Sequence, residues 1–324
     1  KEFVKLVKEK KETLREKYNL NLVITGIIGS QGMLYQKEGI NVDVLLKYEY
    51  GSTALMEYAK KHYIALQSPL FSGHVLVDCT PTNMDSGEPG LSYMLAALDA
   101  SMDIVSVSKG ALVHSFVDIK KLADLKGCQL KYSGATAAAL PTLDIGEYSL
   151  AGTTVTSIVG ILNGTSNYIL SSMFENGLSF EKALEQAQEK GIAESNPVLD
   201  IKGIDSGCKL LLLANRLLDD SFNLQDVSIE GIDHLTKEDI LHVKKRGNQL
   251  KLLAEAHKQD ESWLLEVKVC EITKEHSLYH VKDTNKGIVF ETMEMGSICV
   301  TGGASHPRGA AAAALKDLIN IYNH

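Results

Sequence analysis

The sequence lacks the features that mark secreted, membrane and nucleic-acid-binding proteins. No two cysteines form a CxxC pair, so neither a zinc site nor a disulfide framework is indicated, and a cytoplasmic location is favoured. No apolar run approaches the roughly 18 to 20 residues that span a bilayer, so we expect no membrane contact. The formal net charge of −8 and the pI near 5.7 argue against nucleic acid as a partner.

The 324 residues, 44% of them hydrophobic, are enough for two domains. In the first part of the chain, strand and helix patterns alternate, which predicts parallel strand pairing in an α/β fold. We predict helices at 1–18, 53–62, 93–100 and 111–125, and strands at 21–28, 74–80, 103–108 and 129–132. Ligands of such sheets bind beyond the carboxyl ends of the strands, here after residues 80 and 108.

The pattern changes after residue 133, and a second, α+β domain is predicted. Its expected strands are 153–162, 263–272 and 287–293, and its expected helices are 167–175, 180–190 and 204–218. The Ala-rich segment 309–322 favours a terminal helix. We therefore predict a Rossmann-like nucleotide-binding domain at 1–132, with 304–324 folding back onto it, and a substrate and dimerisation domain at 133–303.

The end of the first predicted strand bears on the choice of nucleotide. An Asp or Glu at this place often holds the ribose hydroxyls of NAD, whereas here the chain reads Gly29-Ser30-Gln31-Gly32. With no carboxylate to repel a 2′-phosphate, and with Ser30 able to donate a hydrogen bond, NADP is favoured over NAD. The alternative interpretation is that GSQG is only a turn.

Two further stretches carry groups suited to chemistry. Asn163-Gly164-Thr165 stands where a buried strand gives way to a helix, which suits a polar or anionic ligand, although an ordinary helix cap is the alternative. The stretch 191–217 holds Glu194 and Asp200, followed by Asp205 and Lys209, which are four residues apart on one helix face. Lys209 precedes a run of four leucines, so its ammonium is expected at the edge of the core and in reach of proton transfer. An exposed salt bridge is the alternative.

GILNGTSNYIL (160–170) followed by GIAESNPVLDIKGIDSGCK (191–209) closely resembles the signature of homoserine dehydrogenase. The resemblance extends over DCTPTN (78–83), SKGAL (108–112), HSLYHVKDTNKGIVF (276–290) and the terminal helix. It implies NAD(P)-dependent interconversion of L-homoserine and L-aspartate 4-semialdehyde, in the biosynthesis of threonine, methionine and isoleucine.

The resemblance also implies roles for individual residues. The catalytic groups are Lys109, Lys209 and Asp205. The substrate-binding residues are Glu194, Asp200, Gly164 and Thr165. The positions near the cofactor are Thr80, Ser108, Lys109 and Gly303. The strand-end argument above adds Ser30 to them. In some relatives a monovalent cation, Na⁺ or K⁺, binds backbone carbonyls that correspond to Ser133, Thr136, Ala138 and Leu140.

Three positions depart from the family pattern. Ser108 stands where an asparagine is usual, Ile192 where an aromatic residue is frequent, and Ser133 where a glutamate leads the cation-binding segment. By resemblance, the first strand and its glycine-rich loop would precede Lys1. A homodimer is expected, and no inhibition by threonine, because no regulatory domain follows the core in this sequence.

Two alternatives remain at this point. A related NAD(P)-dependent enzyme could act on another amino-acid-derived aldehyde, although the set from Glu194 to Lys209 argues against it. A catalytically inactive binding subunit is the second alternative, and it leaves the retained lysines and carboxylates without a purpose.

Overall fold

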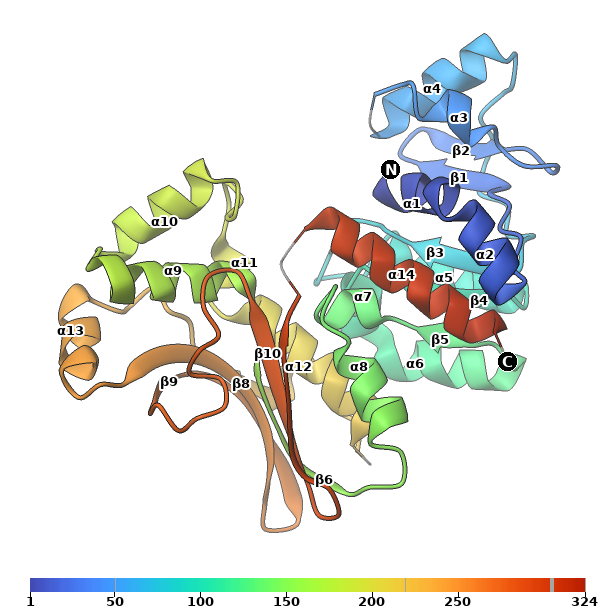
Figure 1. The fold of residues 1–324 in the computed structure, drawn as a ribbon. Helices are drawn as coiled ribbons and strands as arrows, with labels where there is room; N and C mark the ends of the chain where they lie inside the picture. Colours follow the sequence, from blue (N-terminus) through green and yellow to red (C-terminus); the bar gives the residue numbers. More distant parts are fainter. Residues whose placement is uncertain (50, 219, 304–305, 324) are drawn as a thin grey trace.

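The computed structural model describes residues 1–49, 51–218, 220–303 and 306–323. Residues 50, 219, 304–305 and 324, which belong to the predicted domains, lie outside the described residues. In Figure 1 a parallel sheet and its helices lie at the right, and a larger curved sheet lies at the left. We call them the parallel-sheet region (α1 to β5, with α14) and the mixed-sheet region (β6 to β11). The predicted α/β class is confirmed.

The parallel-sheet region has the strand order β3-β4-β5, with all neighbours parallel. Its strands are β3 (Val75–Asp78), β4 (Asp103–Ser106) and β5 (Leu130–Lys131), and the helices between them are α5 (Gly90–Asp99) and α6 (Gly110–Lys126). The strands are short, but each lies inside its predicted range. The carboxyl ends of β3 and β4 therefore meet at one edge, as the sequence predicts.

The terminal helix α14 (Pro307–Tyr322) packs on this parallel sheet, across the strands shown in Figure 1. Its Ala314, Leu318 and Ile321 bury against Val105 of β4. The first helix, α1 (Glu2–Glu9), packs in turn on α14, burying Leu6 and other apolar residues of both helices. The described part of the C-terminal segment therefore lies on the parallel-sheet region, and the division of the chain into domains stays a prediction.

The N-terminal prediction is corrected in two places. The single helix at 1–18 is two helices, α1 and α2 (Lys11–Tyr18), which meet at Lys10. The strand at 21–28 is reduced to β1 (Gly26–Gly29), which pairs antiparallel with β2 (Gly32–Tyr35) in a hairpin of its own. Gly32, the first residue after the turn, has φ +118°, a backbone conformation that residues other than glycine rarely adopt. The helices α3 (Val42–Leu45) and α4 (Gly51–Lys61) follow.

The mixed-sheet region has six strands in the order β11-β10-β6-β8-β9-β7. These are β6 (Val155–Ile161), β7 (Val227–Ile229), β8 (Gln249–Gln259), β9 (Ser262–Ile272), β10 (Lys286–Thr292) and β11 (Gly296–Gly302). Helices α9 (Gly164–Asn176) and α12 (Ile204–Leu217) pack against β8. Sequence reasoning missed β7, β8 and β11, and it also missed the short helix α11 (Val198–Ile201) and the helix α13 (Lys237–Lys245). The helix α10 (Phe180–Glu189) precedes α11.

The chain passes between the two regions at two crossings. The first, between β5 and β6, contains α7 (Ser133–Thr136), α8 (Thr142–Asp144) and a π-helical turn (Ile145–Ser149). The second joins β11 to α14. One continuous hydrophobic core runs beneath the junction, from α5 and α6 through the leucines of α12 to β8 and β9. The regions are therefore packed together rather than connected only by the chain.

Candidate active site

Asp205 is the centre of a buried charged cluster at the junction of the two regions. It stands in the first turn of α12 and is 9% exposed. Its Oδ2 lies 2.5 Å from Lys209 Nζ, and its Oδ1 lies 3.4 Å from Lys109 Nζ. The three residues predicted as catalytic are therefore brought together.

The two lysines reach Asp205 from different regions. Lys109 immediately precedes α6, at the carboxyl end of β4, and belongs to the parallel-sheet region. Lys209 lies one turn along α12 from Asp205, and its ammonium also donates to the carbonyl oxygen of Leu162 at 2.8 Å. A salt bridge on an exposed helix face, the alternative interpretation for Lys209, does not describe this arrangement, because the Lys209 and Asp205 side chains are each only 12% exposed.

Asn163 connects this cluster to a second carboxylate, and sequence reasoning did not assign it a role in the site. Its Nδ2 donates to Asp205 Oδ2 at 2.8 Å and to Asp200 Oδ1 at 2.6 Å. Its Oδ1 accepts from the backbone N–H of Ser166 at 2.8 Å, which caps α9. The signal that pointed to it was its place as the cap before Gly164 and Thr165.

The pKa values of the two linked carboxylates, Asp205 and Asp200, are shifted in opposite directions. Burial alone would raise the pKa of Asp205, but the charges of Lys209 and Lys109 hold it well below its ordinary value. Burial raises the pKa of Asp200, the negative charge of Asp205 adds to this shift, and the hydrogen bond from Asn163 opposes it. Asp205 is thus a fixed anion beside two cations, and Asp200 binds a proton more readily than a free aspartate does.

The other predicted substrate residues lie around α9. Gly164 and Thr165 open that helix and are buried, and the Thr165 hydroxyl donates to the carbonyl oxygen of Ile192 at 3.2 Å. Glu194 stands in the exposed loop between α10 and α11. Gln188 bonds its backbone carbonyl, but among the described residues its carboxylate has no hydrogen-bond or ion-pair partner. Asp200 therefore contacts the cluster, whereas Glu194 does not.

Two of the positions predicted near the cofactor, Thr80 and Ser108, share a hydrogen-bond network at the carboxyl edge of the parallel sheet. Asp78 ends β3 and is 3% exposed. Its Oδ2 accepts from the Ser106 hydroxyl at 2.8 Å, and its Oδ1 accepts from the backbone N–H of Thr80 at 3.0 Å. The backbone N–H of Ser108 lies 3.2 Å from Ser106 Oγ. This network fixes the loops that carry Thr80, Ser108 and Lys109, and sequence reasoning did not single out Asp78 as its anchor.

Ser30 lies in the hairpin turn between β1 and β2, so GSQG is a turn, as the alternative interpretation has it. The backbone N–H of Ser30 donates to Ser52 Oγ at 2.9 Å, and the two hydroxyl oxygens lie 2.8 Å apart. A turn at this position is still compatible with contact to a nucleotide, and a cofactor role for Ser30 stays a prediction.

The segment expected to hold a monovalent cation forms part of the first crossing. The Ser133 carbonyl accepts from the Thr136 hydroxyl at 3.0 Å, and the Leu140 carbonyl accepts from the Thr142 N–H at 2.8 Å. Ala138 adopts a positive φ of 53°. Gly303 packs on this turn, since a Cβ at Gly303 would lie 2.7 Å from the backbone nitrogen of Leu140.

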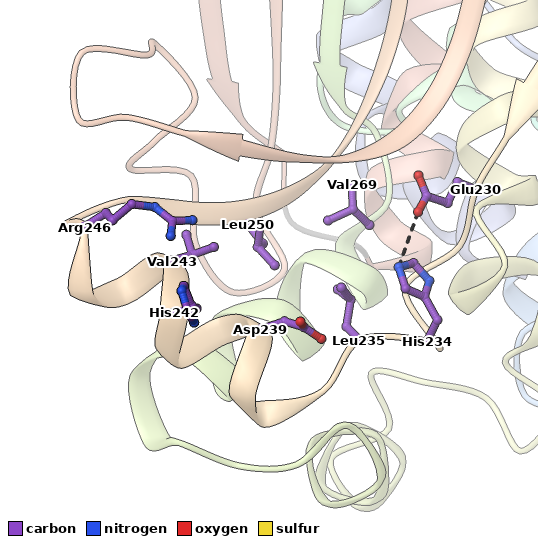
Figure 2. Close-up of a pocket in the computed structure, with 9 residues that line it drawn as sticks. All are labelled: Glu230, His234, Leu235, Asp239, His242, Val243, Arg246, Leu250 and Val269. Carbon is purple, nitrogen blue, oxygen red and sulfur yellow. Dashed lines mark ion pairs between the residues drawn. The ribbon is translucent and has the colours of Figure 1, made fainter.

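A hollow of about 380 Å³ lies elsewhere, against α13 and the strands β8 and β9. Figure 2 shows it lined by charged, imidazole and aliphatic side chains, with His234 paired to Glu230. The paired atoms are 3.3 Å apart. It contains no predicted site residue. The charged cluster around Asp205 lies at the junction instead.

The structure adds three observations on the composition. Cys79, Cys128, Cys208, Cys270 and Cys299 are all free thiols. Within the described ranges, no three His, Cys, Asp or Glu side chains gather as metal ligands. None of the helices described is both long and apolar enough to cross a membrane.

Comparisons with known proteins agree with this geometry. A homoserine dehydrogenase from Methanocaldococcus jannaschii is 30% identical over 322 residues, covering 98% of this chain and 94% of that protein. A protein named NAD(+)-dependent homoserine dehydrogenase, from Pseudomonas canavaninivorans, is 28% identical and covers 98% of this chain and 91% of that protein. A solved structure from Archaeoglobus fulgidus, 27% identical, superposes with a TM-score of 0.84 and covers 100% of this chain and 96% of that one. The family model described as homoserine dehydrogenase matches residues 141–319, and the chain belongs to the homoserine dehydrogenase family of oxidoreductases.

Proposed function

We propose that this protein interconverts L-homoserine and L-aspartate 4-semialdehyde, with NADP or NAD as the second substrate. The observation that carries the proposal is the cluster in which Lys109, Asp205 and Lys209 meet at the junction of the two regions. Oxidation of an alcohol to an aldehyde moves a hydride and a proton, so a site needs an oriented nicotinamide and a group that transfers the proton.

The cofactor's place follows from the sheet. Ligands of parallel sheets bind beyond the carboxyl ends of the strands, and here Thr80 and Ser108 stand at two adjacent ends, held by the buried Asp78. These residues fit a dinucleotide, and the resemblance adds Gly303, which packs on Leu140 of the first crossing. A bound nicotinamide supplies the hydride acceptor in one direction and the donor in the other. Since no carboxylate follows β1, NADP is the nucleotide we favour.

Lys209 is the proton-transferring group in this proposal. In the reductive direction its ammonium donates a proton to the aldehyde oxygen while the carbonyl carbon receives the hydride, and in the oxidative direction its amine accepts the hydroxyl proton. The ammonium of Lys109 adds a second positive charge near the same oxygen, where negative charge develops. Asp205 holds both lysines in place and balances part of their charge.

The substrate's own ammonium requires carboxylates. Asp200, held by Asn163 at the edge of the cluster, is the nearer of the two candidates. Glu194 is the second, from a loop connected to α9 through Thr165 and the Ile192 carbonyl. We assign Gly164 and Thr165 to the substrate side of the site, where they begin the helix that Asn163 caps.

The setting of the reaction is part of the same proposal. We propose a cytoplasmic enzyme of threonine, methionine and isoleucine biosynthesis that acts as a homodimer. The negative net charge and the unpaired cysteines support the cytoplasm. The homodimer is checked by light scattering at micromolar concentration, where a monomer would contradict it.

The test is homoserine-dependent reduction of NADP and of NAD, followed by the absorbance of the reduced nicotinamide. We expect activity in the natural protein and a loss of at least about a hundredfold in kcat/KM for Lys209→Ala. Lys202→Ala is the matched control, since Lys202 is a nearby lysine whose side chain is 54% exposed, and it should keep full activity. Equal activity in Lys209→Ala and Lys202→Ala would contradict the proton-transfer role.

A further inference from the structure

A third lysine reaches the junction without being one of the predicted site residues. Lys286 is the first residue of β10, an interior strand that pairs with β11 on one side and with β6 on the other. It is 3% exposed, so its ammonium is enclosed by protein. A buried lysine is costly unless its charge is solvated by polar groups, which makes its partners informative.

Those partners are backbone carbonyls. Lys286 Nζ lies 3.3 Å from the carbonyl oxygen of Ala137 and 3.2 Å from that of Gly303. Among the described residues, no carboxylate forms an ion pair with it. A monovalent cation bound by carbonyl oxygens, which replace its water shell, has the same kind of environment. The lysine therefore presents a positive charge to backbone oxygens as a bound K⁺ ion would.

The two carbonyls belong to the two crossings between the regions. Ala137 lies in the turn that leads from α7 to α8, where its carbonyl also accepts from the N–H of Leu140 at 3.2 Å. Gly303 lies after β11, on the way to α14, and packs directly on Leu140. Lys286 thus connects the segment that enters the mixed-sheet region to the segment that leaves it.

This arrangement does not fit a Na⁺ or K⁺ ion at the segment 133–140. Two of the four carbonyls expected to bind it, those of Ser133 and Leu140, each accept one hydrogen bond within the crossing and keep one lone pair, so the group that decides the fit is Lys286. The ammonium of Lys286 stands at Ala137, in the middle of the same segment. A second monovalent cation there would be repelled by a charge held in low-dielectric surroundings.

The surrounding charges show that Lys286 belongs to the active-site neighbourhood. Burial, followed by the charge of Lys209, lowers the pKa of Lys286 to about 8, while Asp205 acts in the opposite direction and Lys109 adds to the lowering. The lysine is therefore near enough to the cluster to contribute to its field. It is a positioning residue, since the structure places it against backbone and not against reacting atoms.

We propose that the Lys286 ammonium takes the place of a monovalent cation at the two crossings, so that this enzyme is ordered and active without bound Na⁺ or K⁺. The substituting group cannot dissociate, because it is part of β10, and the salts are compared at about pH 7, where the lysine is protonated. Only the kinetic part of this inference rests on the proposed function; the part that concerns order and stability stands independently.

The first arm of the test uses the natural protein in KCl, NaCl and tetramethylammonium chloride at equal ionic strength. We expect thermal unfolding midpoints that agree within about 1 °C, and kcat/KM values that agree within about twofold, because there is no ion to lose. A rise of about 5 °C or more in K⁺ or Na⁺, or a gain in kcat/KM of about threefold or more, would overturn the proposal. If no homoserine oxidation is seen in any salt, the proposed function fails, and the unfolding midpoints still decide this inference.

The second arm uses Lys286→Ala and Lys286→Met. We expect both to lose at least about tenfold in kcat/KM in tetramethylammonium chloride, and Lys286→Ala to regain at least about threefold in K⁺ or Na⁺, because it leaves room for an ion. Lys286→Met fills that room without a charge and should not respond. Unchanged kcat/KM and unfolding midpoint in Lys286→Met, or an equal response of both variants to K⁺, would count against the proposal.

Lys251 provides the matched control. It is also buried in the mixed sheet, 1% exposed, and its Nζ also donates to a backbone carbonyl, that of Val281 at 2.6 Å, as well as to Asn167 Oδ1. It stands away from both crossings. Lys251→Met should lower the unfolding midpoint without creating a response to K⁺ or Na⁺. Such a response in Lys251→Met would show that the effect comes from losing any buried lysine, and would overturn the proposal for Lys286.

Discussion

Asp78 and Asp205 are both buried aspartates near the junction, but they are surrounded by different donors. Asp78, 3% exposed, accepts from a serine hydroxyl and a backbone N–H. Asp205, 9% exposed, faces two lysines and an asparagine amide. The first arrangement fixes the shape of two loops, and the second concentrates charge at a point where both regions meet.

The difference shows that burial of a carboxylate does not by itself identify a catalytic group. Neutral donors satisfy Asp78 locally, and its role ends with the conformation of the strand ends. The lysines around Asp205 hold its pKa well below the usual value and keep it ionised, so it sets the electrostatics of the whole cluster. What surrounds the carboxylate therefore decides its role.

The comparison is tested most directly by Asp205→Asn against Asp78→Asn. We expect Asp205→Asn to lower kcat by about 10² or more, because it leaves two buried ammonium groups without their counter-charge. Asp78→Asn should lower kcat by less than about tenfold and act mainly through a raised KM for the nucleotide. Steady-state kinetics with each substrate varied checks both, and equal losses in kcat would break the comparison.

Asn163→Ala should have the next largest effect. It removes the amide that separates Asp200 from Asp205 and also removes the cap of α9. We expect a loss of about tenfold to a hundredfold in kcat/KM for homoserine and a loss in unfolding free energy of about 1 kcal/mol from the cap.

Ser179→Ala is the control for Asn163→Ala, since Ser179 caps α10 and its side chain plays no part in the cluster. It should lose a similar free energy of unfolding and keep its activity. If Ser179→Ala were equally impaired in kcat/KM, the effect of Asn163 would be one of helix stability and not of the cluster.

Gly303→Ala is expected to have a smaller effect, confined to the cofactor side. The position has φ +67°, and a Cβ would meet the backbone of Leu140 at 2.7 Å, so the two crossings must move apart. We expect KM for the nucleotide to rise by about fivefold or more, with little change in kcat. Gly296→Ala carries the same backbone strain at φ +70° with nothing within 4 Å of its Cβ, and nucleotide affinity there should not change.

The smallest expected effect is a dependence of stability on alkaline pH. Burial lowers the pKa of Lys251 to about 8 from its usual 10.5, with Lys282 adding to the shift and Glu175 and Asp283 opposing it. Between these two pH values the unfolded chain holds the proton that the native Lys251 has lost, so the contribution of Lys251 to stability should rise with pH across this window. Lys286 contributes in the same direction.

Thiols such as those of Cys79 and Cys270 act on alkaline stability in the opposite direction to Lys251, because burial raises their pKa. Denaturant unfolding at pH values of about 7, 9 and 10 measures the contribution of Lys251 as the difference in unfolding free energy between the natural protein and Lys251→Met, which should shift in favour of the natural protein as pH rises. The exposed Lys202 again provides the control, and the difference between the natural protein and Lys202→Met should not change with pH. A pH-independent difference for Lys251→Met would contradict the assignment.

Local sequence patterns located most helices and strands, but they failed where long-range pairing decides. The strand β8 was missed because Lys251 and Glu255 interrupt its apolar pattern, and its eleven-residue pairing with β9 cannot be read locally. The strand expected at 21–28 became a hairpin because a two-residue turn offered a nearer partner. Among the site residues, Lys109, Asp205 and Lys209 were predicted through family motifs. Asn163 and Asp78 were not assigned, since their importance lies in what they contact across the fold.

Lys109 and Asp205 come from different regions, so their ion pair depends on how closely the two regions pack. Neither region alone holds a charge-balanced site, so competence is a property of their junction and not of either fold. We expect a slight loosening at the crossings to separate Lys109 from Asp205 before the helices and strands unfold. Activity should then be lost at lower denaturant concentrations than secondary structure.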